Sequence, residues 1–234
     1  MLKAYGYYLD VSGLSYDDIH ERYFHLIESS RKSRIEKCVR DDPKKMLLYT
    51  GAALGSVLKR FGASAEDVVL SDKGKPFVKG RDDLYFNISH SGQYIVIVAA
   101  PGEIGTDIQK PVKVTESLVR RIASDKEREA YKDLINDRFN LFWAVKESYS
   151  KLTGDGIGTD FAGVRFEFEG GIEGEFGLDS DSAKILYHTQ AGFDDKQDQV
   201  PVSAFGKAVY ITSEFPVVTC MYSDFTIDFE PLSL

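Results

Sequence analysis

The sequence lacks any apolar run long enough to cross a membrane. The longest, Tyr94 to Pro101, falls far short of the roughly 20 residues that span a bilayer. The first ten residues also lack the apolar stretch and small-residue cleavage site of a secretory signal. We therefore expect a cytoplasmic protein that makes no membrane contact.

Cysteine and positive charge are scarce as well. Cys38 and Cys220 are better interpreted as reduced, incidental thiols than as a disulfide, and their spacing is not that of a metal centre. The 29 Lys and Arg residues are outnumbered by 37 Asp and Glu, which gives a net charge of -8. General nucleic-acid binders need the opposite balance, so we expect no nucleic-acid partner. The 43% hydrophobic content is typical of a soluble enzyme.

Hydrophobic spacing and turn residues predict helices followed by strands, and this order occurs twice along the chain. A seam falls near residues 101–104. We expect an α+β fold of two similar lobes, residues 1–103 and 104–234, related by a pseudo-twofold axis and with the active site between them. Helices are predicted from Ser15 onward and at 46–61, 124–135 and 138–153, and strands at 4–9, 68–70, 85–88, 94–99, 164–168, 184–188, 208–212 and 217–222.

One helix carries the most informative pattern. In the helix predicted for 138–153, Trp143, Glu147 and Lys151 follow one another at intervals of four and share a face, apart from an apolar stripe. Such a face either holds a plain surface ion pair or forms the wall of a charged site. Asp107 and Gln109 stand two apart on a predicted strand and share its face. An Asp, a Glu and an amide brought together suit Mg²⁺, although Asp107 alone also suits a turn.

Two further segments carry groups that bind anions. Ser89 and His90 lie within the stretch Phe86 to Gly92, where their donors suit a phosphate or simply hydrogen bond within the fold. Residues 31–40 are locally basic, which more often indicates a solvated face. The glycines at 154, 156 and 158 follow a helix, so they do not match the dinucleotide-binding fingerprint.

Four motifs occur in a familiar order: Gly-Lys-Pro from Gly74, Phe-Asn-Ile-Ser-His-Ser-Gly from Phe86, Gly-x-Asp-Ile from Gly105, and Trp-x-x-Lys-Glu-Ser-x-x-Lys from Trp143. In this order and spacing the chain resembles the 4′-phosphopantetheinyl transferases of the surfactin-synthetase-activating type, over residues 4–158. The resemblance implies transfer of the 4′-phosphopantetheine arm of coenzyme A to a serine of an apo acyl or peptidyl carrier protein. The other product is adenosine 3′,5′-bisphosphate.

The resemblance also assigns roles to residues. Asp107 and Glu147 would bind Mg²⁺. Gln109 stands where several members have an acidic residue, and it would be a further ligand that binds through water. Glu147 would be the general base and Lys151 would neutralise charge on the pyrophosphate. The residues expected to contact coenzyme A are Arg34, Lys37, Lys75, Ser89, His90 and Lys151. Lys44, Lys45, Met46 and Leu47 stand where the family often has an arginine.

Beyond residue 158 the resemblance fades, and the carrier-binding surface is expected at about 154–184. Because both partners would be acidic, the contact should be apolar or use a local basic patch. Two lobes in one chain could complete the site within a monomer. The alternatives are a homologue that binds coenzyme A or a carrier protein without catalysis, and an unrelated Mg²⁺-dependent nucleotide hydrolase.

Overall fold

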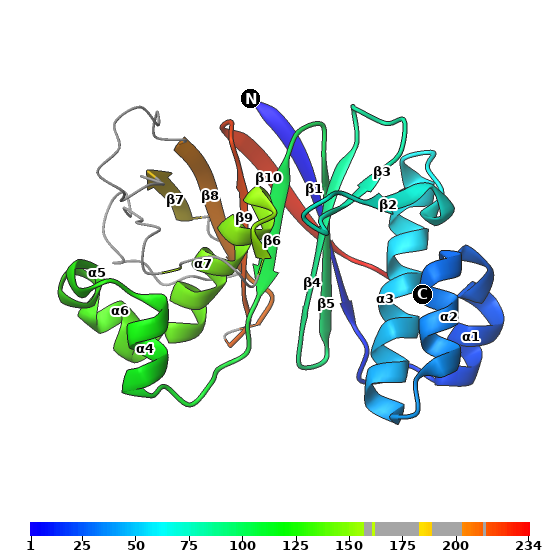
Figure 1. The fold of residues 1–234 in the computed structure, drawn as a ribbon, viewed down its shortest axis with the longest axis horizontal. Helices are drawn as coiled ribbons and strands as arrows, with labels where there is room; N and C mark the ends of the chain where they lie inside the picture. The colour runs from blue at the N-terminus through cyan, green and yellow to red at the C-terminus, as the bar shows by residue number, and fades with distance from the viewer. Residues whose placement is uncertain (157–160, 162–182, 189–202, 213) are drawn as a thin grey trace.

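A computed structural model describes residues 1–156, 161, 183–188, 203–212 and 214–234. Helices lie at both ends of the molecule, and β-sheets lie between them (Figure 1). This mixed architecture confirms the predicted α+β class. The expected strand at 164–168 lies outside the described residues. Within the described part, no helix is long and apolar enough to cross a membrane, and Cys38 and Cys220 are unpaired.

The first and the last strand of the chain belong to the same sheet. Its order is β10-β1-β5-β4, and β1 pairs parallel with β10 and antiparallel with β5. The bounds are Leu2–Asp10 for β1, Tyr85–Ser91 for β4, Tyr94–Ala100 for β5 and Phe225–Pro231 for β10. The C-terminal strand β10 thus lies in the same sheet as β1, β4 and β5, and the expected division of the chain at residue 103 stays a prediction. The short ribbon of β2 (Val68–Leu70) and β3 (Pro76–Val78) stands apart from this sheet.

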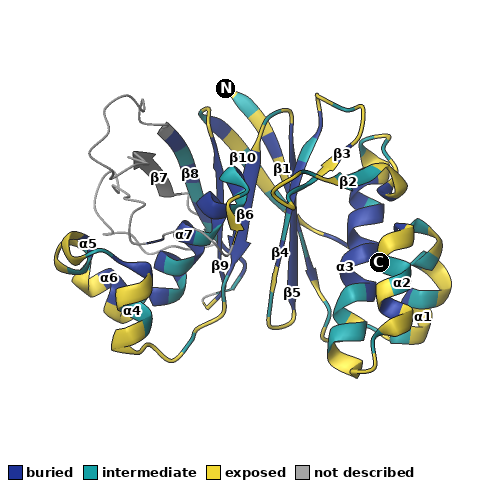
Figure 2. Ribbon diagram, viewed as in Figure 1, coloured by how far each residue is buried: buried dark blue, intermediate teal, exposed yellow. Residues whose placement is uncertain are grey.

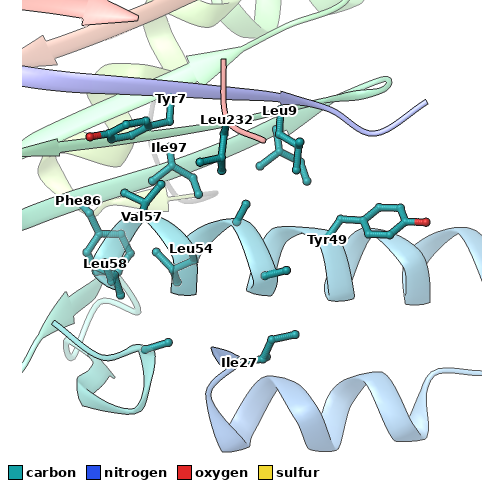
Figure 3. Close-up of a cluster of buried hydrophobic side chains, with 14 of the residues drawn as sticks. Tyr7, Leu9, Ile27, Tyr49, Leu54, Val57, Leu58, Phe86, Ile97 and Leu232 are labelled. Carbon is teal, nitrogen blue, oxygen red and sulfur yellow. The ribbon is translucent and has the colours of Figure 1, made fainter. Parts of the chain in front are cut away.

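Three helices cover one face of the first sheet (Figure 1). They are α1 (Tyr16–Tyr23), α2 (Ser29–Lys37) and α3 (Asp41–Arg60), with a 3-10 turn at Phe24–Leu26. Leu54, Val57 and Leu58 of α3 pack under the sheet in a buried apolar cluster (Figure 3). Residues 31–37 of the basic stretch, for which no helix is predicted, lie in α2. Helix α3 begins at Asp41 rather than at the expected Met46, because acidic residues suit the first turn and Pro43 loses no intrahelical bond there.

A second sheet has the order β6-β9-β8-β7, with antiparallel neighbours. The bounds are Ile104–Ile108 for β6, Ala183–His188 for β7, Ser203–Tyr210 for β8 and Pro216–Met221 for β9. Helix α7 (Phe139–Thr153) packs on β6 and β9. Its predicted apolar stripe is buried, and Gly154 ends it in the left-handed conformation with φ of 77°.

Shorter helices precede α7. Ser124 forms a capping box, since its hydroxyl accepts from the Glu127 N–H and the Glu127 carboxylate accepts from the Ser124 N–H. The helix predicted from there to Ile135 is broken at Tyr131. The three segments are α4 (Glu116–Ile122), α5 (Asp125–Ala130) and α6 (Lys132–Asp137).

An apolar cluster joins the two sheets. It includes Val96 and Val98 of β5, Ile104 and Ile108 of β6, and Val217 of β9. The strands are accordingly buried where the sheets meet, whereas the outer helices expose one face (Figure 2). The chain thus forms layers of helices, sheet, sheet and helices. The pseudo-twofold relation between the predicted lobes stays a prediction.

Candidate active site

Strand β4 meets β6 through polar side chains at alternate positions. Asn87, Ser89 and Ser91 share one face of the strand, because they are alternate residues, and this face is turned toward β6. The contacts are Asn87 Oδ1 with the Thr106 N–H at 3.2 Å, Ser89 Oγ with Asp107 Oδ1 at 2.6 Å, and Ser91 Oγ with the Lys110 N–H at 3.0 Å. The edge strands of the two sheets are thereby joined without a backbone ladder.

Helix α7 approaches β6 very closely at Gly105. A Cβ at this position would lie 2.1 Å from the Ser148 carbonyl oxygen and 2.5 Å from the Leu152 nitrogen. Only glycine fits, because both atoms belong to the helix backbone. Asp107 shares this strand face, so its carboxylate points toward α7 as well.

Asp107, Ser89 and Lys151 form a compact triangle. The Lys151 ammonium donates to Asp107 Oδ1 at 2.6 Å and to Ser89 Oγ at 2.9 Å. Asp107 is only 5% exposed, and its buried Oδ2 atom has no hydrogen-bond partner among the described residues. A buried carboxylate oxygen without a partner is costly, so the site is set to receive a cation or a donor there.

Glu147 lies next to this triangle, one turn before Lys151 on α7. Burial, followed by the charge of Asp107, raises the pKa of the Glu147 carboxyl above its ordinary value. The charge of Lys151 and a hydrogen bond from Trp143 oppose the shift. Two carboxylates that repel one another are therefore held together, as in many catalytic sites.

His90 lies at the exposed rim of the site. Partial desolvation, followed by the charge of Lys151, lowers the pKa of its imidazole, and Asp107 opposes this effect. The charge of Arg31 on α2 also lowers the pKa of His90.

Arg31 was missed by sequence reasoning, although it stands one turn before Arg34. Its guanidinium is oriented by a 2.6 Å bond to Glu28.

The remaining expected residues lie in different surroundings. Arg34 and Lys37 are on exposed positions of α2. The Gln109 N–H donates to the Pro216 carbonyl oxygen, and the Gln109 carbonyl oxygen accepts from the Asn140 side chain. Lys75 lines a cavity of about 250 Å³ with Lys151, Asn87 and Gly154. Its ammonium bonds to the Leu152 carbonyl oxygen at 2.8 Å and to the Glu103 carboxylate.

Sequence reasoning also missed the supports of α7. The Lys146 ammonium is fully buried and donates to Glu127 at 2.8 Å and to the Phe161 carbonyl oxygen at 2.7 Å. The charge of Arg121 on α4 acts on Glu147. The position of Lys146 among the apolar residues of the predicted helix could have indicated that it is buried and paired with an acidic residue.

The donor set suits a small hard cation. Among the described residues, no group of three or more His, Cys, Asp and Glu side chains could hold a metal ion. Mg²⁺, however, needs only one or two carboxylates and takes its other ligands from water and substrate phosphates. Asp107, with its unpartnered buried oxygen, and the neighbouring Glu147 fit that requirement.

Comparison with known proteins decides the family. The family described as the 4′-phosphopantetheinyl transferase superfamily matches residues 103–203, which include Asp107, Glu147 and Lys151. A 4′-phosphopantetheinyl transferase of Bacillus subtilis is 31% identical over 186 residues, 73% of this chain and 80% of the relative. The chain belongs to the 4′-phosphopantetheinyl transferases.

Further relatives agree with this assignment. The 4′-phosphopantetheinyl transferase Sfp of Bacillus subtilis (strain 168) is 29% identical, with 73% of this chain and 80% of the relative covered. The L-aminoadipate-semialdehyde dehydrogenase-phosphopantetheinyl transferase of Xenopus laevis is 31% identical over 54% of this chain and 45% of its own. The predicted family is confirmed, and with it the prediction that this 4′-phosphopantetheinyl transferase is an enzyme.

Proposed function

We propose that this transferase moves the 4′-phosphopantetheine arm of coenzyme A to a serine of an apo acyl or peptidyl carrier protein. The observation that supports it best is the contact of Lys151 with Asp107 beside Glu147, where the two sheets meet. In the reaction the serine oxygen forms a bond to the phosphorus that carries the pantetheine arm. The bond from that phosphorus to the bridging oxygen breaks, and adenosine 3′,5′-bisphosphate leaves.

Glu147 is the proposed general base. It would accept the proton of the carrier serine, because its carboxylate lies beside Asp107 and Lys151, the groups proposed to surround the reacting phosphate. Lys151 neutralises the negative charge that develops on the leaving oxygen. In the structure its ammonium is already oriented by Asp107 and Ser89, which reduces the reorganisation needed in the transition state.

Asp107 and Glu147 are the proposed Mg²⁺ ligands, with Gln109 as a ligand through water. When bound, the cation supplies positive charge at the pyrophosphate. The buried, unpartnered Oδ2 atom of Asp107 supports its place in this set.

The coenzyme A site is proposed to extend from this centre toward the first sheet and its helices. Ser89, His90 and Lys151 would contact phosphates, and Arg34 and Lys37 would reach them from α2. The stem of Lys75 would form a wall, because it lines the cavity next to Lys151. Desolvation, followed by the charge of Lys151, lowers the pKa of the His90 imidazole, whose N–H would donate a hydrogen bond to a phosphate oxygen.

The partner and the assembly also remain proposals. Most of the expected carrier-binding surface, 154–184, lies outside the described residues. We propose that the enzyme works as a cytoplasmic monomer of two pseudo-twofold lobes, 1–103 and 104–234, with β10 returning to the first lobe. The site would then be completed within one chain.

The test is the mass of the carrier. Incubation of the enzyme with coenzyme A, Mg²⁺ and apo carriers of several types should add the mass of the arm to at least one carrier. Glu147→Ala should abolish this transfer, whereas Glu21→Ala, on the exposed face of α1, should not. Binding of coenzyme A or a carrier without any mass change would favour the non-catalytic alternative.

A further inference from the structure

Lys75 has an ammonium that is occupied by protein groups. It donates to the Leu152 carbonyl oxygen at 2.8 Å and pairs with the Glu103 carboxylate, and the Lys75 side chain is only 15% exposed. Lys73 in the same turn pairs with Asp155, and the two acidic partners are equally accessible, at 44% for Asp155 and 45% for Glu103, but the Lys73 side chain is 63% exposed. Exposed pairs contribute little, so the shielded Lys75 ammonium, which also contacts the Leu152 carbonyl oxygen, is the one able to hold structure.

These two contacts join the elements that carry the reactive groups. Glu103 immediately precedes β6, which carries Asp107, and Leu152 immediately follows Lys151 on α7. Lys75 itself immediately precedes β3, in the other half of the chain. A single ammonium therefore joins the start of one active-site element to the end of the other.

The contact with Leu152 also answers a local need of α7. The last four carbonyl groups of a helix have no partner within it, and the C-terminal end carries partial negative charge. Gly154 satisfies the Ser150 carbonyl. The Lys75 ammonium satisfies the Leu152 carbonyl and brings a positive charge to the negative end of the helix.

We propose that Lys75 and Glu103 form a clamp that positions the last turn of α7 against β6, so that Lys151 meets Asp107 in the reactive arrangement. This role rests on the proposed transfer reaction. Lys75 would be a positioning residue, because its ammonium holds protein groups and does not take part in the reaction. Removal of the clamp lets the last turn of α7 shift. Small displacements of this kind lower the rate more than they lower substrate affinity.

The experiment compares Lys75→Met, Glu103→Ala and the double variant in carrier transfer, with Lys3→Met as the control for loss of an exposed lysine. Each single variant should lower kcat about tenfold. The KM for coenzyme A, and its Kd by calorimetry, should stay within about twofold of wild type, because the ammonium is occupied by Glu103 and the Leu152 carbonyl oxygen and methionine keeps the apolar stem. The double variant should be no slower than the slower single variant, since both remove one clamp.

The kinetics of Glu103→Ala distinguish two roles for Lys75, because a clamp and a phosphate-binding lysine predict opposite effects on kcat and KM. If the ammonium binds coenzyme A, removal of the competing Glu103 carboxylate should leave kcat unchanged and lower KM, while Lys75→Met raises KM. That pattern, or wild-type kcat in both single variants, overturns the clamp. Melting curves show whether Lys75→Met is folded, and Glu103→Ala supplies the test if it is not. Absence of transfer by the wild-type enzyme would instead reject the proposed function.

Discussion

Removal of the buried Lys146 ammonium should destabilise the protein strongly. Lys146 and Glu127 form an ion pair whose side chains are 0% and 4% exposed. In Lys146→Met the apolar part of the side chain is kept, but the Glu127 Oε1 atom and the Phe161 carbonyl oxygen each lose this donor. Glu127 keeps its bonds to Ser124 through Oε2, so the capping box by itself survives.

The expected size follows from the burial of the pair. Removing one partner of a buried ion pair costs about 3 to 5 kcal/mol, because the other charge stays buried without compensation. For a chain of 234 residues this corresponds to a fall in Tm of roughly 6 to 20 °C. The double variant Lys146→Met with Glu127→Gln should recover part of the loss, since it leaves no unpaired charge.

Thermal unfolding followed by circular dichroism measures this effect. Arg120→Met is the matched control, because Arg120 and Glu116 form a pair on α4 whose side chains are 63% and 76% exposed. It should change the free energy of unfolding by less than about 0.5 kcal/mol. A Tm of Lys146→Met within about 2 °C of the control would refute the reasoning.

Two other substitutions test the site itself. Burial and the charge of Asp107 raise the pKa of the Glu147 carboxyl in the folded protein. The ionised carboxylate therefore destabilises the folded state at pH values above the unfolded pKa of about 4.3. Glu147→Gln should accordingly have a higher Tm than wild type at pH 7 in the absence of metal. The difference should shrink as pH falls through the raised pKa and vanish below about pH 4, and a lower Tm at pH 7 would contradict it. Gly105→Ala should cost about 1 to 3 kcal/mol and slow transfer, since its Cβ pushes the α7 backbone away from β6; unchanged Tm and kcat would count against the close packing.

The pattern of the sequence predicted the parts of the site that depend on local periodicity. The spacing of Glu147 and Lys151 set one face of a helix, and Gly154 and Ser124 marked the helix boundaries that the structure has. The strand predicted to carry Asp107 is present as β6, whereas β4 continues to Ser91, beyond its predicted end at residue 88. The family followed from four ordered motifs, and the relatives confirm it.

Contacts between distant segments could not be predicted in this way. The break at Tyr131, the helical form of the basic stretch and the return of β10 to β1 all depend on what each segment packs against. Periodicity reports the face that a residue occupies, but not the partner that covers this face. The roles of all the expected site residues, Arg34, Lys37 and Gln109 among them, therefore stay predictions.

By itself, then, the sequence determined the types of residue at the site and the faces on which they lie, because helix and strand periods are local properties of the chain. Only the tertiary structure decided that the Lys151 ammonium meets Asp107 and Ser89, that Lys146 is buried against Glu127, and that the Lys75 ammonium binds Glu103 and the end of α7. These contacts join residues that are far apart in the chain. They form because the fold brings α7 against β6 at Gly105 and brings β4 against β6 through Ser89 and Asp107.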